Sequence, residues 1–182
     1  MAQPKTLLDD HNFLEFMVTA KQKTYASGGE TRAIQLSHGG WMYTFNDERW
    51  PQWRFTDQWD GTGPLDNPFF GREMYFERTD EFGPFVPIAH MAYDGYALGD
   101  PRQVKKTFAF LESMLKRVDT TSLFRGPISN CLIEDGFEYR CYWNRRDPFR
   151  ICGAERILFA EDPEDLTSGF RYQLDFQFCC LR

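Results

Sequence analysis

The stretch Phe170-Arg171-Tyr172-Gln173-Leu174-Asp175-Phe176-Gln177-Phe178 alternates large apolar side chains with polar ones over its whole length. Because neighbouring side chains of a strand point to opposite faces, this alternation predicts a strand with one face on a core and one in water. Cys180 extends the apolar face by one position. A strand with one wet face is typical of an antiparallel sheet.

Similar but shorter patterns occur upstream of this stretch. Trp41, Tyr43 and Phe45 alternate with smaller or less aromatic residues and predict a strand with an aromatic face. Further strands are predicted at residues 73–77, 88–93, 137–143 and 156–160.

Two segments instead have the spacing of amphipathic helices. Asp10 is a suitable N-cap for a helix that carries Phe13, Met17 and Ala20 on one face. Asp100-Pro101 is a strong helix start, and the helical spacing that follows it is kept by Val104, Phe108, Leu111, Leu115 and Val118. The order of elements predicts an α+β fold, in which two helices cover one face of a curved antiparallel sheet or open barrel.

The two halves of the chain share short motifs. Gly40-Trp41-Met42-Tyr43 is echoed by Gly136-Phe137-Glu138-Tyr139, and Phe70-Gly71-Arg72-Glu73 is echoed by Cys152-Gly153-Ala154-Glu155. Aromatic strand positions, Tyr93 and Phe176, follow the two Gly-x-Glu motifs at similar distances. We therefore expect an internal duplication within one compact domain, with units at 1–99 and 100–182 and a ligand site between them.

The first half is longer because of residues 46–67, which contain Trp50, Trp53 and Trp59 among Pro and Gly residues. We interpret them as an insertion, either a hairpin or a lid over a ligand, since loops that carry several rings often cover binding sites. The alternative is that these rings pack on their own scaffold.

Composition excludes several classes of function. The net charge is −6 and there is no run of Lys or Arg, so binding of nucleic acid or of anionic membranes by this chain alone is not expected. No apolar stretch approaches the length of a membrane span, and the first residues contain no signal core, so a cytoplasmic location is expected. The five cysteines have no metal-binding spacing, and we expect reduced thiols.

The candidate chemical groups are carboxylates and one histidine. Glu73 and Glu155 are the repeated acids; we expect Glu73, which follows the Trp-rich residues, to be the functional one and Glu155 to be structural. The structural alternative for both is pairing with Arg or with backbone donors. His90 falls in a predicted strand and is a candidate proton-transfer group. The histidines form no cluster, so no metal is expected.

The candidate ligand-binding residues are mostly aromatic: Trp41, Tyr43, Trp53, Trp59, Tyr93, Tyr139 and Trp143, with Glu155 as a polar anchor. Lys21 and Lys23, at the end of the first helix, are explained by the helix dipole.

Several motifs together resemble a bacterial family of uncharacterised domains. They are Phe13-Leu14-x-Phe16, Ala20-Lys21-x-x-Thr24-Tyr25-Ala26, Phe69-Phe70-Gly71-x-Glu73, Tyr93-x-Gly95, Arg125-Gly126-Pro127 and Gly153-x-Glu155. Members of that family often follow a helix-turn-helix DNA-binding domain of the Xre type, which implies an effector-sensing or partner-binding role. This sequence starts almost directly at the domain, so a repressor role is not expected. The resemblance supplies no catalytic residues.

Three functions therefore stay open. The first is a domain that binds a small, partly apolar molecule in an aromatic cleft. The second is a cofactor-independent isomerase, cyclase or lyase that uses a carboxylate or histidine as acid or base. The third is a protein-interaction module with exposed aromatic anchors. A homodimer is also left open.

Overall fold

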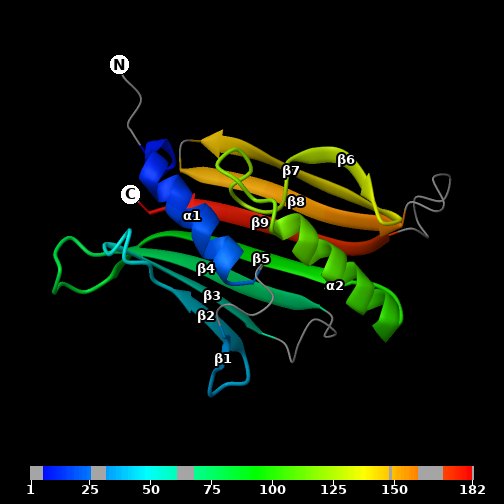
Figure 1. The fold of residues 1–182 in the computed structure, drawn as a ribbon, viewed down its shortest axis with the longest axis horizontal. Helices are drawn as coiled ribbons and strands as arrows, with labels where there is room; N and C mark the ends of the chain where they lie inside the picture. The colour runs from blue at the N-terminus through cyan, green and yellow to red at the C-terminus, as the bar shows by residue number, and fades with distance from the viewer. Residues whose placement is uncertain (1–5, 26–31, 61–67, 148, 160–169, 182) are drawn as a thin grey trace.

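The computed structural model describes residues 6–25, 32–60, 68–147, 149–159 and 170–181, which form one antiparallel sheet and two helices (Figure 1). The glycine-containing segments Ser27-Gly28-Gly29 and Gly61-Thr62-Gly63, whose composition predicts turns, lie outside the described residues. In chain order, the elements are η1 (Leu7–Asp9), α1 (His11–Lys23), β1 (Ile34–Gln35), β2 (Trp41–Phe45), β3 (Trp53–Asp60), β4 (Phe69–Glu77), β5 (Val86–Ala97), α2 (Pro101–Leu115), β6 (Ser129–Glu134), β7 (Phe137–Asp147), β8 (Arg150–Phe159) and β9 (Phe170–Cys180).

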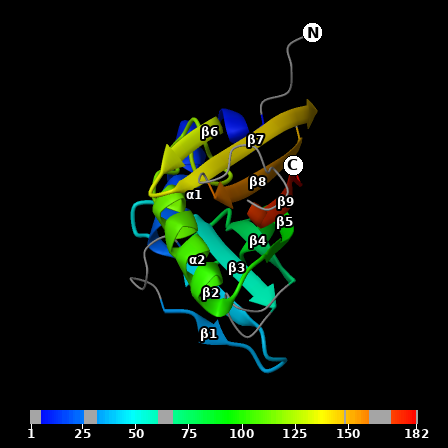
Figure 2. The same ribbon diagram turned by 90° about the vertical axis from the view of Figure 1, so that its right-hand side faces the viewer.

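The described strands form a nine-stranded sheet in the order β1-β2-β3-β4-β5-β9-β8-β7-β6. The chain moves from one edge to the centre through β5, crosses by way of α2 to the other edge, and returns to the centre with β9. The two central strands, β5 and β9, pair antiparallel from Ala89 opposite Cys180 to Ala97 opposite Tyr172. Both helices lie on the same side of the sheet, which we call the inner face (Figure 2).

The alternation of the last strand is confirmed. Tyr172, Leu174, Phe176 and Phe178 are buried, whereas Asp175 and Gln177 are exposed. The α+β fold with two helices on a sheet is therefore as expected.

Both helix starts are confirmed. The carboxylate of Asp10 accepts hydrogen bonds from the backbone N–H groups of Asn12 and Phe13, and Asp100 caps α2 in the same way. Pro101 occupies the first helical position, where its missing N–H costs nothing. Helix α2 ends at Leu115, so Val118, predicted to continue it, lies beyond the helix although its side chain is buried.

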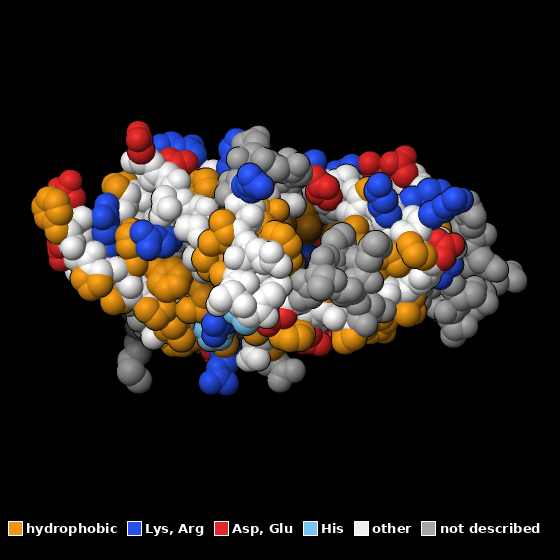
Figure 3. All heavy atoms as spheres, turned by 90° about the horizontal axis from the view of Figure 1, so that it is seen from below, with side chains coloured by type: hydrophobic (Ala, Val, Ile, Leu, Met, Phe, Trp, Pro, Cys, Tyr) orange, Lys and Arg blue, Asp and Glu red, His pale blue; other side chains and the backbone are white. Residues whose placement is uncertain are grey.

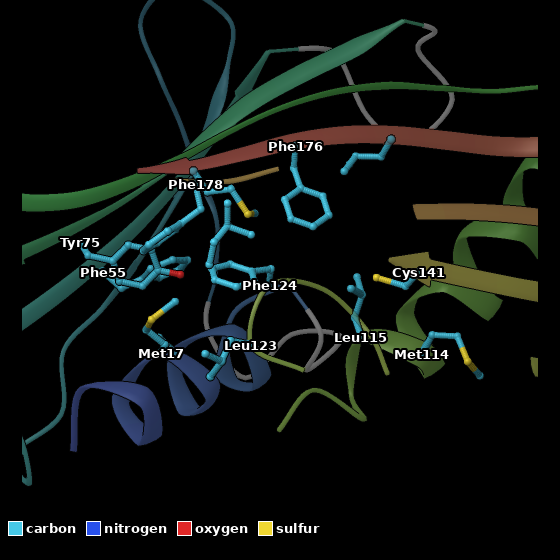
Figure 4. Close-up of a cluster of buried hydrophobic side chains, with 14 of the residues drawn as sticks. Met17, Phe55, Tyr75, Met114, Leu115, Leu123, Phe124, Cys141, Phe176 and Phe178 are labelled. Atoms are coloured by element: carbon cyan, nitrogen blue, oxygen red, sulfur yellow. The ribbon is translucent and has the colours of Figure 1, made fainter. Parts of the chain in front are cut away.

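The core between the helices and the inner face is largely aromatic. Phe124, from the segment that follows α2, has its ring centroid 4.9 Å from that of Phe178 and 5.4 Å from that of Trp143. Figure 4 shows Phe176 and Phe178 pointing from β9 toward the helices, with Phe124 beneath them.

Residues 46–67 are expected to form a hairpin or a lid, and the part that the structure describes forms a hairpin, because β2 and β3 pair antiparallel. β3 occupies Trp53–Asp60 and pairs with β2 on one side and β4 on the other, so it belongs to the sheet. Residues 61–67 lie outside the described residues. A short strand next to Pro51 resembles a loop in sequence because Pro and Gly dominate its flanks.

The proposed equivalence of Tyr43 and Tyr139 is wrong. Tyr43 lies on β2, two strands before the Gly-x-Glu strand β4, whereas Tyr139 lies on β7, directly beside the Gly-x-Glu strand β8. By position in the sheet, β7 corresponds to β3. Alternation of apolar and polar residues identifies a strand, but it does not show which other strands lie beside it in the sheet.

The glycine of each Gly-x-Glu motif has a defined packing role. Gly71 lies opposite Tyr93 and Gly153 lies opposite Phe176 across the strand pairs. A Cβ atom at either glycine would overlap the ring opposite it. Both glycines therefore make room for an aromatic ring that lies flat over the neighbouring strand.

The surface has no concentration of basic groups on the side shown in Figure 3, where Lys and Arg are dispersed among acidic and hydrophobic side chains. All five cysteines lie within described residues and are free thiols. No helix among the described residues is long and apolar enough to cross a membrane.

Candidate functional site

A pocket of about 320 Å³ lies between α2 and the inner face of the sheet. Seven aromatic residues line it: Tyr25, Tyr43, Trp59, Phe69, Tyr93, Phe108 and Tyr172. The charged groups in its wall are Asp57, Glu112 and Arg125. Its volume is at the lower end of the range for small-molecule sites, and its aromatic wall with few polar groups is typical of them.

The pocket floor adjoins a set of buried charges. Among the described residues, the buried acids are Asp57 on β3, Glu73 on β4 and Glu155 on β8, and the buried cations are Lys21 and Arg125. Buried charges are costly unless they are paired and hydrogen-bonded. The partners of each carboxylate therefore indicate its role.

Glu73 is fully paired. The ammonium group of Lys21, on α1, lies 2.6 Å from Glu73 Oε2 and also donates to the carbonyl oxygen of Phe124 at 3.0 Å. The hydroxyl groups of Tyr75 and Tyr25 donate to the same carboxylate at 2.7 and 3.3 Å.

The helix-dipole explanation is therefore wrong for Lys21. Its side chain is completely buried, and burial lowers its pKa while the charge of Glu73 raises it. This lysine is an internal counter-ion that joins α1 to the sheet.

Glu155 is paired in a similar way. The guanidinium group of Arg125 contacts Glu155 Oε2 through Nε at 3.0 Å and through an Nη atom at 2.9 Å. Tyr139 and Tyr172 donate their hydroxyl groups to this carboxylate at 2.6 and 3.1 Å. Glu73 and Glu155 are equally buried and each has a cation and two tyrosines, so the geometry gives no support to a functional Glu73 beside a structural Glu155.

Asp57 is the carboxylate that differs. Its side chain is 3% exposed and lies on β3 directly opposite Glu73. The Tyr93 hydroxyl donates to Asp57 Oδ1 at 2.8 Å. Within the described part of the chain, no Lys, Arg or His lies at ion-pair distance from Asp57.

The protonation of Asp57 follows from this environment. Burial, and next the negative charge of Glu73, raise the pKa of the Asp57 carboxyl to about 7, although the Tyr93 hydroxyl and Lys21 oppose the shift. Burial and Asp57 itself raise the pKa of Tyr93, so the Tyr93 hydroxyl keeps its proton and acts as the donor. Asp57 therefore exchanges a proton near neutral pH at the wall of the pocket.

Tyr43 and Trp59 form a partly exposed aromatic pair in the pocket wall. Tyr43 on β2 and Trp59 on β3 are diagonal neighbours with ring centroids 5.2 Å apart, and both are only half-buried. Burial raises the pKa of Tyr43, followed by the negative charges of Asp57 and Glu112. Both carboxylates therefore act on the same part of the pocket.

The structure brings together only some of the residues predicted from sequence. Tyr43, Trp59 and Tyr93 line the pocket. Trp53 does not: it is 4% exposed, and its ring centroid lies 5.3 Å from that of Phe13, so it belongs to the core under α1. The correction follows from strand alternation, which places Trp53 and Trp59 on one face but at opposite ends of β3.

The remaining predicted residues lie outside the pocket wall. Trp41 pairs with Trp59 across β2 and β3, Trp143 packs on Phe124, and Tyr139 is fully buried against Glu155. His90 alternates with the buried Ala89 and Met91, and therefore lies on the outer face of the sheet, where partial burial and then the positive charge of Arg72 lower its pKa. A role for His90 in the pocket is thus excluded by its position.

Sequence analysis missed Asp57, Glu112 and Arg125. Asp57 could have been found from the alternation Trp53, Phe55, Asp57, Trp59, which places an acid on an aromatic face. Arg125 stood in the Arg-Gly-Pro motif without an assigned role. Glu112 is half-buried on α2, where it pairs with Lys116 one turn later, and it carries no local signal in the sequence.

Comparisons with models of protein families, with curated proteins and with solved structures gave no match. In the described residues, no group of three His, Cys, Asp or Glu side chains is placed to hold a metal ion.

Proposed function

We propose that this protein binds a small, partly apolar molecule in the pocket between α2 and the inner face of the sheet. The observation that carries the proposal is a concave aromatic wall interrupted by a few charged groups. Aromatic rings supply contact area at a low cost in conformational entropy, and isolated polar groups fix the orientation of a ligand. The resemblance to domains that follow helix-turn-helix regulators is consistent with effector sensing.

Two polar groups of the pocket wall are fixed by hydrogen bonds to buried carboxylates, which favours a fixed binding geometry. Arg125 is held by Glu155, and Tyr93 is held by Asp57. Rings on the far wall also hold one another: the Phe69 centroid lies 5.9 Å from that of Tyr172 and 6.1 Å from that of Phe108. A preorganised site loses less free energy on ordering when a ligand binds.

The experiment uses a neutral fluorescent aromatic compound, N-phenyl-1-naphthylamine, and a matched pair of variants. Trp41 and Trp59 face each other in register on β2 and β3, and only Trp59 lines the pocket. We expect saturable fluorescence enhancement with the unmodified protein and with Trp41→Leu, and a loss of affinity of about tenfold or more with Trp59→Leu. No enhancement, or equal affinity in the two variants, would contradict the proposal.

An enzyme is the alternative that one observation favours. The Asp57 carboxyl has a pKa of about 7, beside a tyrosine hydroxyl in an aromatic pocket, and such a group can serve as a general acid or base. Asp57 would then replace Glu73 and His90 as the acid–base group. Turnover of a bound compound that stops in Asp57→Asn would favour the enzyme, whereas binding without turnover favours the sensor.

The third function, a protein-interaction module, has weaker support. Exposed rings such as Phe70, Phe82 and Tyr142 exist, but the rings that line the pocket form a concave surface. The free thiols accord with the reducing cytoplasm that we propose as the location.

We also propose that the two halves arose by duplication. The sheet order is symmetric about the β5–β9 pair, from β2 and β6 inward. Each half has a Gly-x-Glu strand whose carboxylate meets a buried cation, Lys21 or Arg125. The pocket would then lie mainly on the first half, with α2 and β9 contributed by the second.

A further inference from the structure

The buried charges of the described residues do not balance. Three carboxylates face two cations, and both cations are engaged: Lys21 with Glu73, and Arg125 with Glu155. Asp57 is left with one hydrogen bond, from a neutral hydroxyl group. It is also the one of the three carboxylates that lines the pocket.

We propose that the ligand of this pocket is an organic cation, such as an arylalkylamine, whose positive charge lies against Asp57 and whose apolar part lies on Tyr43 and Trp59. This inference rests on the proposed function, which supplies the pocket as a binding site. It adds the chemical class of the ligand.

The fold itself does not need a carboxylate at this position. In the other half, the residue opposite the buried glutamate Glu155 is Cys141, and the ring over the motif glycine is Phe176. In the first half, these places hold Asp57 and Tyr93. Asp57 and Tyr93 thus occupy the places that Cys141 and Phe176 hold in the other half. The polar pair lies in the half that forms most of the pocket wall.

A second carboxylate, Glu112, adds negative charge to the same wall, although Lys116 partly offsets it through an exposed ion pair at 3.0 Å. Glu112 projects from α2 into the wall of the same pocket, and Asp57 and Glu112 both act on the Tyr43 hydroxyl. The faces of Tyr43 and Trp59 carry the negative side of an aromatic quadrupole, which attracts cations. Among the described residues, Arg125 is the one cation in the wall, and its charge is offset by Glu155.

Binding of a cation is then coupled to the proton on Asp57. The groups that act on Asp57 are Glu73 on β4, Tyr93 on β5, Lys21 on α1 and Arg125 after α2; Tyr43 on β2 faces it across the strand pair, and Glu112 on α2 lies in the same wall. A cation stabilises the ionised carboxylate, so its affinity should rise as the pH increases from about 6 to about 8. An arylalkylamine stays protonated over that interval, because an alkylammonium group, like that of lysine, titrates near pH 10.

The experiment compares three compounds of nearly equal shape: 2-phenylethylamine, 2-phenylethanol and phenylacetate. Dissociation constants are measured by titration calorimetry at pH 6 and pH 8 for the unmodified protein, for Asp57→Asn and for Asp94→Asn. Asp94 is exposed on the outer face of β5, one residue from Tyr93, and is the control for a general loss of negative charge.

We expect the unmodified protein and Asp94→Asn to bind the amine at least about tenfold more tightly than the alcohol at pH 8, with a smaller preference at pH 6. Asp57→Asn should lose both the preference for the amine over the alcohol and its pH dependence. Asparagine retains an acceptor for the Tyr93 hydroxyl, and a thermal melt verifies that the variant is folded.

Three results would overturn the inference. If the alcohol binds as tightly as the amine, or phenylacetate binds most tightly, the ligand is not a cation, although the pocket is still a binding site. If none of the three binds while N-phenyl-1-naphthylamine does, the inference also fails alone. If none of the four compounds binds, the proposed function fails with it.

Discussion

Asp57 on β3 lies directly opposite Glu73 on β4, and a single buried ammonium group, that of Lys21, forms an ion pair with Glu73 and not with Asp57. Of these two neighbouring carboxylates, Glu73 therefore has a cationic partner and Asp57 has none at ion-pair distance. The consequence is a division of roles, in which Glu73 and Lys21 fix α1 to the sheet and Asp57 is left to titrate at the pocket.

The Lys21–Glu73 pair should be essential for stability. Lys21→Met leaves the Glu73 charge buried without its counter-ion, and we expect a loss of about 3–5 kcal/mol in the free energy of unfolding. The control is Lys105→Met, because Lys105 is a lysine of the other helix, α2, with an exposed side chain, and its removal should change stability by less than about 0.5 kcal/mol. Urea denaturation measures both.

The double variant Lys21→Met/Glu73→Gln should recover part of the loss, because no charge is then left unpaired. Equal stabilities of Lys21→Met and Lys105→Met would show that the buried ion pair is not formed.

Asp57 should reduce stability at high pH. Its pKa is about 7 in the folded protein and about 4 in an unfolded chain. Between these values the folded state holds a proton that the unfolded state has released, so the free energy of unfolding falls as the pH rises from about 4 to about 7. Asp57→Asn removes this dependence.

The measurement is the difference in unfolding free energy between Asp57→Asn and the unmodified protein across this pH range. The variant should gain in relative stability as the pH rises, by a few kcal/mol at most. Asp94→Asn, on the outer face, should show no such trend, and a flat difference for Asp57→Asn would refute the raised pKa.

Trp53 should behave as a core residue. Its indole packs on Phe13 and Phe16 and donates to Glu77 at 3.0 Å. Trp53→Ala should cost about 3–5 kcal/mol, as for other large-to-small changes at buried rings. Trp59→Ala, on the same strand but half-buried, should cost clearly less in the same thermal or urea melts. The reverse order would mean that Trp53 is part of a lid after all.

The spacing of apolar residues, together with the N-cap residues of the helices, allowed both helices and most strands to be predicted from the sequence. The glycines of the two Gly-x-Glu motifs also helped to locate strands. Each lies opposite an aromatic ring on the neighbouring strand, where a side chain would not fit. β3 was missed because its flanking Pro and Gly residues outweighed its alternation. As a result, the strand β2 in the first half was matched to β7 in the second half, although β3 is the strand that corresponds to β7.

The candidate site was harder to predict because its key contacts are long-range. Lys21 is 52 positions from Glu73, and a lysine at the end of a helix is explained equally well by the helix dipole. Whether Asp57 is paired depends on where Lys21 and Arg125 lie in space. No local pattern contains that information.

The most direct test of the central claim, that this pocket binds a small aromatic molecule, is to follow the five tryptophan indole N–H signals by two-dimensional NMR during titration with N-phenyl-1-naphthylamine. Single Trp→Phe variants assign the signals. We predict that the Trp59 signal shifts in a saturable way while the signals of the buried Trp50 and Trp53 stay within the line width. A titration in which Trp59 does not move, or in which Trp53 moves instead, would contradict the account.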